Sequence, residues 1–216
     1  MLTLHHLLTS RSSRIIWLLE ALGIKYELVT HRRDANMRAQ ADLAAIHPLG
    51  KAPTIVDGDL VLIESATILR YIAEHYGNGR FMPPAGTKAR AKHDEWLDYA
   101  ESSLMMPVIL KLSSLMGGGT SSLVDFAAPE FEKAMDHVAG GVTPGPFLMG
   151  AELTLADMQL SYCLSLMESA GLLQNRPAVQ AYWQRLQAEP SFKRAIEIGG
   201  PMVSPYAQML ETFEKE

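Results

Sequence analysis

Three short segments of the 216-residue chain carry polar side chains at positions where they could bind an anion. They are Ser10-Arg11-Ser12, Lys51-Ala52-Pro53 and Glu64-Ser65. The first segment precedes a predicted helix and the third opens another. The first N–H groups of a helix have no partner within it, so they attract carboxylates and other anions. Serine at such a position is also the ordinary helix cap, and a lysine in a loop is ordinarily solvated. The residues alone therefore leave both interpretations open.

The cysteine, histidine and glycine patterns exclude several other kinds of chemistry. The single cysteine, Cys163, excludes an intramolecular disulfide, a CxxC redox pair and a cysteine-based zinc site, and its apolar helical surroundings predict an inert buried thiol. His5 and His6 alternate across a predicted strand, so their rings point to opposite faces and cannot share a metal ion. The Gly117–Gly119 run follows a helix rather than a strand, unlike a phosphate loop. We therefore expect no metal.

Charge and hydropathy narrow the class of partner. The chain carries 19 Lys and Arg against 24 Asp and Glu, a net charge of −5, which argues against a nucleic-acid-binding face. The longest apolar run, from Leu104 to Leu110, is too short to cross a membrane and contains a proline. The N-terminus lacks the basic start of a secretory signal. We therefore expect a cytoplasmic protein that binds neither nucleic acid nor membrane.

Over the first two-fifths of the chain, the predicted elements alternate between strands and helices. Hydrophobic spacing predicts a strand over 2–8, a helix over 15–22, a strand over 25–29, an irregular helix over 31–46, strands over 54–56 and 60–63, and a helix that opens at 64 and ends at 77. The length of the first crossover favours parallel pairing, and Asp57-Gly58-Asp59 predicts a hairpin. This order predicts a mixed four-stranded sheet with helices on its faces.

The rest of the chain is predicted to be helical. The segment from Phe81 to Gly86 has the composition of a linker. The helices beyond it cover 88–116 with a bend at Pro107, cover 129–138, start at a capping-box-like Thr154 and Asp157, and open at Pro177. We therefore expect a first domain over 1–79, a linker over 80–87 and an all-helical domain over 88–216.

Four segments, in order along the chain, resemble the cytosolic glutathione S-transferases. They are SRSSRIIWLLE from Ser10, HPLGKAP from His47, ESATILRYI from Glu64, and FLMG from Phe147 followed by TLAD from Thr154. Each segment alone is a weak signal, but together, in this order over most of the chain, they are specific. The chain is most similar to a bacterial and fungal branch that uses serine rather than tyrosine after the first strand.

The resemblance implies the fold and the partners. It implies an α/β thioredoxin-like N-terminal domain, an all-α C-terminal domain, a homodimer, and glutathione as co-substrate. Pro53 matches the family's cis-proline, which would leave the backbone of Ala52 free to pair with the cysteinyl backbone of glutathione. Lys51 would meet the glycyl carboxylate. Ser65 would hold the γ-glutamyl carboxylate, and Glu64 would pair with the α-amino group.

The implied activity is transfer of the glutathione thiol to an electrophile, a chemistry of detoxification. The thiolate is the nucleophile, and an ordinary thiol is mostly protonated at neutral pH. A hydrogen bond from Ser10 to the charged sulfur would contribute about 1.5–3 kcal/mol, and the helix end about 0.3–1 kcal/mol. Since one pKa unit corresponds to about 1.4 kcal/mol, the thiol pKa would fall by about 1–3 units.

Other residues of the same segments carry alternatives. Ser10 matches the serine-using relatives because it lies four residues before Arg14, but Ser12 and Ser13 are close rivals. Arg11 either adds positive potential at the sulfur or is a solvated loop charge, whereas Arg14 is expected to form an ion pair inside the fold. Further along, His47 replaces the asparagine of many relatives, and either caps its loop or only precedes a proline.

The second substrate is less constrained. Met105, Met106 and Met116 either pack in the core or line a pocket for an apolar electrophile. Glutathione-dependent reduction of peroxides or disulfides on the same site is an alternative, and without a site cysteine it would use only the glutathione sulfur. A non-catalytic interaction protein of the same fold is a third hypothesis. The intact Lys51 and Glu64-Ser65 weigh against it, because a scaffold has no need of them.

Overall fold

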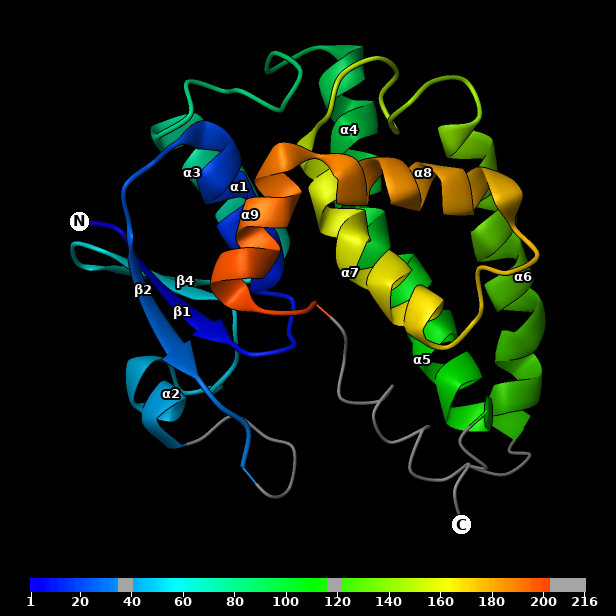
Figure 1. Ribbon diagram of the computed structural model, residues 1–216, viewed down its shortest axis with the longest axis horizontal. Coiled ribbons are helices and arrows are strands. Elements are labelled where there is room, and N and C mark those ends of the chain that lie inside the picture. The colour runs from blue at the N-terminus through cyan, green and yellow to red at the C-terminus, as the bar shows by residue number, and fades with distance from the viewer. Residues whose placement is uncertain (35–40, 116–121, 203–216) are drawn as a thin grey trace.

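The computed structural model describes residues 1–34, 41–115 and 122–202, which form two regions around one continuous hydrophobic core (Figure 1). The first region is a sheet flanked by helices, and the second is helical. The α/β region followed by an all-α region agrees with the fold class expected from the sequence.

A mixed four-stranded sheet forms the first region. Its strands are β1 (Thr3–Leu7), β2 (Glu27–His31), β3 (Thr54–Asp57) and β4 (Leu60–Ile63), in the spatial order β2-β1-β3-β4. β2 is parallel to β1 because a helix crosses over between them, whereas β3 is antiparallel to both β1 and β4. Gly58, with a φ of +62°, makes the tight turn from β3 to β4. The prediction of a mixed sheet is therefore confirmed.

Three helices accompany the sheet: α1 (Ser13–Leu22), α2 (Ala41–Ile46) and α3 (Ser65–His75). Residues 13 to 19 of α1 are all buried, because this helix packs against α3, α7 and α9 as well as lying beside the sheet (Figure 1). Gly23 ends α1 at a φ of +70°, as its sequence position predicted. The start of α1, and with it the segment that carries Ser10, is thus fixed by the core.

Two predicted elements, β2 and the segment after it, have other bounds in the structure than the sequence predicted. The strand predicted over 25–29 lies two residues further on, because its register is set by pairing Thr3 with Glu27. His31 therefore ends a strand instead of opening a helix, and its ring bonds His5 and Asp42. Of the irregular helix predicted over 31–46, the structure has α2 at its end; residues 35–40 lie outside the described part of the chain.

The helical region comprises α4 (Lys88–Tyr99), a π-helical turn η1 (Ala100–Leu104), α5 (Met105–Leu115), α6 (Ser122–Val142), α7 (Leu155–Ser169), α8 (Pro177–Ala188) and α9 (Pro190–Gly199). α4, η1 and α5 follow one another without a break, where a single long helix was predicted. Pro107 has no N–H to bond the carbonyl of Ser103, and Ser103 lies in the π-helical turn. The predicted irregularity at Pro107 therefore lies one turn earlier. α6 begins before Pro129, where the sequence predicted its start.

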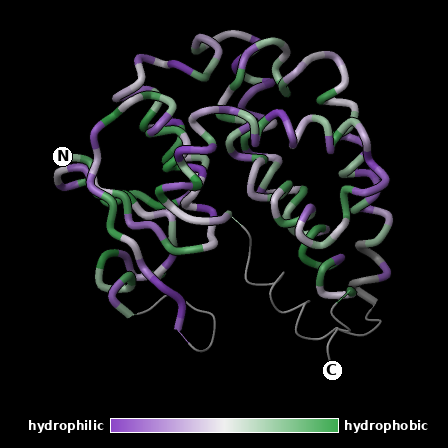
Figure 2. Tube along the Cα trace, in the orientation of Figure 1, coloured by the Kyte–Doolittle hydropathy of each residue, from purple (hydrophilic) through white to green (hydrophobic). Residues whose placement is uncertain are grey.

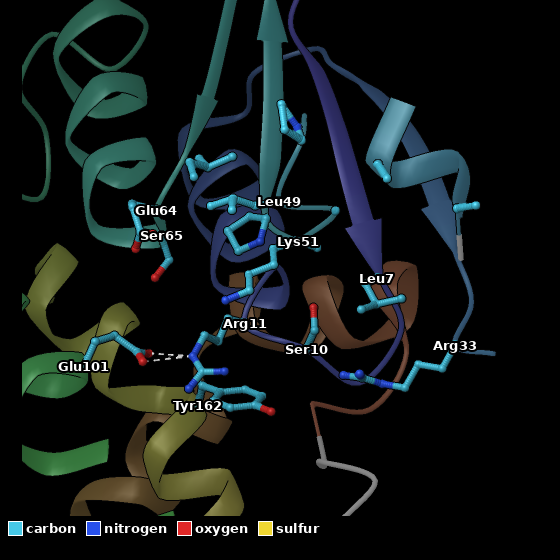
Figure 3. A pocket seen from close by; sticks show the side chains of 17 residues that line it. Leu7, Ser10, Arg11, Arg33, Leu49, Lys51, Glu64, Ser65, Glu101 and Tyr162 are labelled. Carbon is cyan, nitrogen blue, oxygen red and sulfur yellow. Dashed lines mark hydrogen bonds and ion pairs between the residues drawn. The ribbon is translucent and has the colours of Figure 1, made fainter. Parts of the chain in front are cut away.

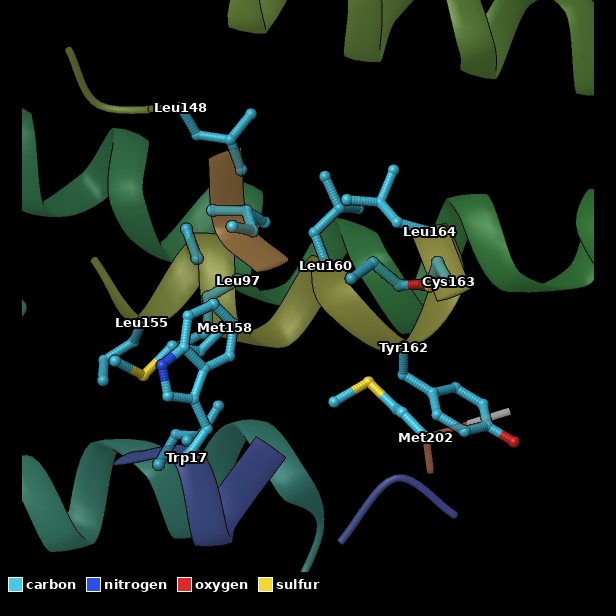
Figure 4. Close-up of a cluster of buried hydrophobic side chains, with 14 of the residues drawn as sticks. Trp17, Leu97, Leu148, Leu155, Met158, Leu160, Tyr162, Cys163, Leu164 and Met202 are labelled. Carbon is cyan, nitrogen blue, oxygen red and sulfur yellow. The ribbon is translucent and has the colours of Figure 1, made fainter. Parts of the chain in front are cut away.

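α7 lies at the centre of the helical region. Its first thirteen residues are buried, and Figure 4 shows Trp17 of α1 beside Leu155 and Met158 of α7. The predicted capping box is present, since the Asp157 carboxylate accepts the backbone N–H of Thr154 at 2.8 Å and the Thr154 side chain accepts the backbone N–H of Asp157. The same carboxylate also accepts the Leu148 N–H at 2.9 Å. The sheet region and the helical region consequently pack against each other through one shared core.

The two regions are also joined by polar contacts. α3 ends at His75 and α4 begins at Lys88, and the predicted linker over 80–87 lies between them. Trp17 donates its indole N–H to Ser191 at 3.0 Å, and the Leu155 N–H bonds the Phe81 carbonyl at 2.9 Å. Hydrophobic and hydrophilic residues alternate along the outer helices α6 and α8 (Figure 2), which is typical of helices with one face in a core.

Candidate functional site

A cavity of about 820 Å³ lies between the sheet region and the helical region (Figure 3). Its lining includes Ser10, Arg11, Lys51, Ala52, Pro53, Glu64 and Ser65 from the first region, and Glu101 and Tyr162 from the second. The three segments singled out from the sequence thus meet at one cavity. Of the residues predicted for the site, Ser12 and its fellow rival Ser13 are missing from this lining.

Ser10 lies in the loop between β1 and α1, at the cavity wall. The structure corrects its predicted role as the cap of α1, because the helix begins at Ser13 and Ser12 occupies the N-cap position. The reason is that the chain makes one more tight turn first, in which the Ser10 carbonyl accepts the Ser13 N–H at 3.3 Å. The Ser10 hydroxyl oxygen accepts the Ser12 N–H at 3.2 Å and lies 2.6 Å from the Ser12 hydroxyl oxygen.

Ser12 lies behind Ser10 and has no exposed surface. Its hydroxyl oxygen is 2.8 Å from Nδ1 of His6 and accepts the Leu7 N–H at 3.2 Å. The other ring nitrogen of His6, Nε2, lies 2.8 Å from the carbonyl oxygen of Gly199 at the end of α9. Burial lowers the pKa of His6, although the Gly199 carbonyl partly opposes this. Ser12 is therefore enclosed by polar partners, and Ser10 is the member of the pair that reaches the cavity.

Two arginines converge on Glu101, which lies in the π-helical turn. Arg14, fully buried, donates to its carboxylate at 2.5 Å. Arg11 donates its Nε–H to the same carboxylate at 2.9 Å, as Figure 3 shows. Burial raises the pKa of Glu101, but Arg14 and Arg11 outweigh it and hold the pKa below its ordinary value. Both guanidinium groups also lie over the Tyr162 ring, about 5 Å from its centre. Arg14 thus forms the internal ion pair predicted for it, and Arg11 is paired rather than a freely solvated charge.

Ser65 begins α3, and Figure 3 shows it across the cavity from Ser10. Its hydroxyl oxygen accepts hydrogen bonds from Arg14 at 3.2 Å and from the amide of Gln159 at 3.0 Å. Glu64 precedes the helix with a φ of +71°, a conformation rare for a residue other than glycine and found most often where structure serves a function. The N-terminus of α3, whose first N–H groups have no partner within the helix, therefore lies at the cavity wall.

The loop before β3 forms a third wall. The Ala52–Pro53 peptide bond is cis, as the resemblance implied. The Lys51 carbonyl accepts the Thr54 hydroxyl at 2.7 Å, and the Lys51 side chain is exposed. His47 accepts the Leu49 N–H on its Nδ1 at 3.3 Å, so it caps this loop, which was one of the two roles considered for it. The loop is therefore held by its own hydrogen bonds, with Lys51 available to a ligand.

Several other sequence features lie away from this cavity. Met105 is buried and Met106 is exposed, neither lines the cavity, and Met116 lies outside the described residues. Cys163 is buried, which raises the pKa of its thiol to about 12, so it is an inert thiol as predicted. His5 bonds His31 while His6 bonds Ser12 and Gly199, so the two rings do face different neighbours.

Four residues around the site were not predicted from the sequence: His6 as a partner of Ser12, and Glu101, Gln159 and Tyr162 from the helical region. Gln159 and Tyr162 are three residues apart on α7, which places them on one face of an otherwise apolar helix. That pair of polar groups was a usable signal. Glu101 gave none, because a π-helical turn changes which residues of a long helix face inward.

Among residues 1–34, 41–115 and 122–202, no three His, Cys, Asp or Glu side chains gather in a way that could hold a metal ion. No helix of the described chain is both long and apolar enough to span a membrane.

Two family models match the chain. The model described as "Glutathione S-transferase, N-terminal domain" matches residues 1–74, and "Glutathione S-transferase, C-terminal domain" matches residues 120–197. Among curated proteins, "Glutathione S-transferase 3" of Zea mays is 30% identical over 194 residues, which cover 85% of this chain and 87% of the relative. "Glutathione S-transferase 1" of Saccharomyces cerevisiae is 26% identical, covering 89% of this chain and 93% of the relative.

Solved structures of glutathione S-transferases also resemble this chain. A glutathione S-transferase from Actinobacillus pleuropneumoniae is 31% identical, with a TM-score of 0.82 over 93% of this chain and 94% of its own. A theta-class glutathione S-transferase from Xanthomonas axonopodis pv. citri, solved with glutathione bound, has the same fold at 21% identity, with a TM-score of 0.71 over 90% of this chain and 96% of its own.

Proposed function

This chain belongs to the glutathione S-transferase family and is a glutathione transferase, and from that premise we propose that Ser10 activates the glutathione thiol for attack on a small electrophile. The observation that carries the proposal is the position of the Ser10 hydroxyl at a cavity wall shared with Lys51, Glu64 and Ser65. Its rival Ser12 is enclosed behind it, and Ser13 is also fully buried.

Glutathione is proposed to lie across the three cavity walls. Its γ-glutamyl carboxylate accepts hydrogen bonds from Ser65 and the N-terminus of α3, while Glu64 pairs with its α-amino group. The backbone of Ala52, before Pro53, pairs with the cysteinyl backbone, and Lys51 meets the glycyl carboxylate. This leaves the sulfur toward Ser10. The Xanthomonas relative of the same fold, solved with glutathione bound, supports glutathione as the ligand.

The proposed second substrate is a small electrophile with an apolar body. Leu7 and the ring of Tyr162 offer apolar contact at the cavity wall. The paired charges of Arg11 and Glu101 adjoin them, so the described wall is mixed rather than purely apolar. Arg11 adds positive potential near the thiolate, which its pairing with Glu101 reduces.

We further propose a cytoplasmic homodimer, as the family resemblance implies. Val61 of β4 and Met106 and Ile109 of α5 are large apolar side chains exposed on the single chain, and they are available to an interface. Light scattering of the purified protein tests this proposal: a mass near twice the 23.8 kDa of one chain supports it, and a single-chain mass contradicts it.

The activation proposal is tested by the ultraviolet absorbance of the thiolate when glutathione binds, followed from about pH 5 to pH 9 around the reference thiol pKa. In the wild type the midpoint should lie well below that of free glutathione, and in Ser10→Ala it should rise toward it. Ser13→Ala is the matched control, because this neighbouring hydroxyl is buried away from the cavity. An unshifted wild-type midpoint contradicts the proposal. Product analysis then separates a thioether adduct from oxidised glutathione.

A further inference from the structure

A line of hydrogen-bonding groups runs from the end of α9 to the cavity, through the interior of the protein. It joins the Gly199 carbonyl to His6, His6 to Ser12, and Ser12 to Ser10, over distances of 2.8, 2.8 and 2.6 Å. His6 and Ser12 have no exposed surface, and Ser10 is 5% exposed. We call His6, Ser12 and Ser10 the relay. Its buried members have no part in binding glutathione as proposed above.

The proton positions in the relay follow from its two ends. A carbonyl oxygen only accepts, so Nε2 of His6 carries a proton and donates it to Gly199. Burial lowers the pKa of His6, so the ring is neutral at neutral pH and Nδ1 is an acceptor. The Ser12 hydroxyl therefore donates to Nδ1.

Ser12 has only one hydroxyl proton, and this determines the direction of the next bond. Because that proton is given to His6, the 2.6 Å contact between the two serines must be a donation from Ser10 to Ser12. Ser10 must also be the donor if the Ser12 hydroxyl donates instead to its other acceptor, the Leu7 carbonyl oxygen at 3.3 Å. In the free enzyme the Ser10 proton thus points inward, and Ser10 can accept a hydrogen bond from a thiol in the cavity.

A thiolate requires the opposite direction. If Ser10 turns its proton to the sulfur, the short contact with Ser12 holds a hydrogen bond only when Ser12 donates to Ser10. Ser12 then gives nothing to Nδ1 of His6, which is left as a buried acceptor without its donor unless it gains a proton of its own. The relay is fully hydrogen-bonded in two states: thiol with neutral His6, or thiolate with protonated His6.

We propose that His6 receives, through Ser10 and Ser12, the equivalent of the proton that glutathione loses at this site. The S–H bond breaks as the proton passes to Ser10. The original Ser10 proton passes to Ser12, and the original Ser12 proton passes to Nδ1 of His6. The products are a thiolate that accepts from Ser10 and an imidazolium that donates to Ser12 and Gly199, with no proton released to solvent. This inference rests on the proposed role of Ser10 and makes His6 and Ser12 positioning residues behind it.

The surroundings of His6 explain why it is neutral until glutathione binds. Burial disfavours its charged form, and His31 on β2 adds repulsion when it is charged, whereas the Gly199 carbonyl on α9 favours the charged form. A thiolate beyond Ser10 adds the negative charge that the free site does not have. The charge on His6 is therefore tied to the charge on sulfur.

The test compares two measurements on the wild-type protein with glutathione as the probe: thiolate formed, by ultraviolet absorbance, and protons released, with a pH indicator in weakly buffered solution. The relay predicts thiolate formation with almost no release of protons. Nitrogen-15 NMR of the histidine rings should show His6 change from the neutral Nε2–H form to the imidazolium on binding. Release of one proton for each thiolate, with His6 still neutral, overturns the relay while leaving the role of Ser10 intact. Failure to form any thiolate overturns both.

Variants locate the proton acceptor. Ser12→Ala keeps His6 but interrupts the relay, so each thiolate should then release one proton and the thiol midpoint should rise. His6→Asn should do the same. His5→Asn is the matched control, because His5 is also a buried histidine on the same strand, and it bonds His31 and stands outside the relay. It should behave as the wild type does. Proton release that stays near zero in Ser12→Ala contradicts the proposed route even if His6→Asn cannot fold.

Discussion

The two serines at opposite ends of the cavity have opposite hydrogen-bond polarity. At the Ser65 end, the hydroxyl oxygen accepts from Arg14 and from Gln159, which occupies both lone pairs and leaves the Ser65 proton to be donated. At the Ser10 end, the hydroxyl donates to Ser12 and accepts the Ser12 N–H. The Ser65 end is ready to bind an anion, whereas the Ser10 end must first rearrange its protons.

The difference extends to the groups that support each serine. The Ser65 end consists of Ser65, Gln159 and Arg14, with Arg14 in turn paired to Glu101. The Ser10 end consists of the neutral relay that ends at Gly199. Both ends depend on the helical region, through α7 and η1 in one case and α9 in the other. We therefore propose that charge supports recognition at one end, and that hydrogen-bond direction controls reactivity at the other.

The largest expected effect concerns the charged end. Replacing Arg14 by methionine removes a fully buried partner of Glu101 and of Ser65. We expect the free energy of unfolding to fall by about 3 kcal/mol, because the Glu101 carboxylate then keeps only Arg11 and the buried Ser65 hydroxyl loses a charged donor. Urea unfolding measures this. Arg11→Met is the control: Arg11 pairs with the same carboxylate but is 35% exposed, so about 1 kcal/mol or less is expected. Equal losses of unfolding free energy in both variants would mean that the buried Arg14 stabilises the protein no more than the partly exposed Arg11 does.

The next effect concerns the neutral end. A Cβ at Gly199 would lie 2.5 Å from Cδ1 of Ile16 and 3.4 Å from the His6 ring, so Gly199→Ala should cost about 2 kcal/mol of stability through overpacking. It should also raise the thiol midpoint, because a shift of α9 away from Ile16 would lengthen the hydrogen bond between His6 and the Gly199 carbonyl. Gly140→Ala in α6 is the matched control. No atom lies within 4 Å of its added Cβ, and a gain of about 0.5–1 kcal/mol is expected. An unchanged thiol midpoint in Gly199→Ala would mean that the position of α9 does not affect the reactivity of Ser10.

Enzyme kinetics should separate the two ends. Ser65→Ala removes one donor to a carboxylate, so the KM for glutathione should rise roughly tenfold, the equivalent of about 1.4 kcal/mol, with the thiol midpoint of bound glutathione unchanged. Ser10→Ala should do the reverse, raising the midpoint while leaving glutathione affinity largely intact. Steady-state kinetics and thiolate titration on both variants measure this. If either variant changes both quantities equally, the comparison between the ends fails.

The sequence predicted those parts of the site whose conformation is determined by residues close by in the chain. Ser10, Lys51 and Ser65 stand in loops or at a helix start, where a few neighbouring residues determine the conformation. Their long-range partners could not be predicted in the same way. Glu101 bonds Arg14 across 87 residues, and Gly199 bonds His6 across 193. Such pairs exist only once α1 has packed against α7 and α9.

The fold shows the same division between local and long-range determinants. Strand β4 lies where hydrophobic spacing predicted it, because a hairpin fixes its register locally. Strand β2 lies two residues from its predicted position, since its register depends on its pairing with β1 across a whole helix.

The smallest expected effect is a pH dependence specific to the charged end. Arg14 and Arg11 hold the pKa of Glu101 below its ordinary 4.5 in spite of burial, so the folded protein binds its proton less readily than the unfolded chain does. The stability that Glu101 contributes is therefore present above pH 4.5 and lost as pH falls through the folded-state pKa. The difference in unfolding free energy between wild type and Glu101→Gln should be constant near neutral pH and shrink toward about pH 3. Urea unfolding at each pH measures this difference.

The matched control for that titration is Asp98→Asn. Asp98 also pairs with an arginine, Arg70, but its side chain is 57% exposed, so solvent screens the pair and its variant should differ little from the wild type at any pH. A difference between wild type and Glu101→Gln that stayed constant through the acid range would mean that Glu101 titrates alike in the folded and unfolded chains. The two arginines would then contribute to this end of the cavity through packing rather than through their charge. The Ser65 end and the Ser10 end would differ only in the geometry of their contacts.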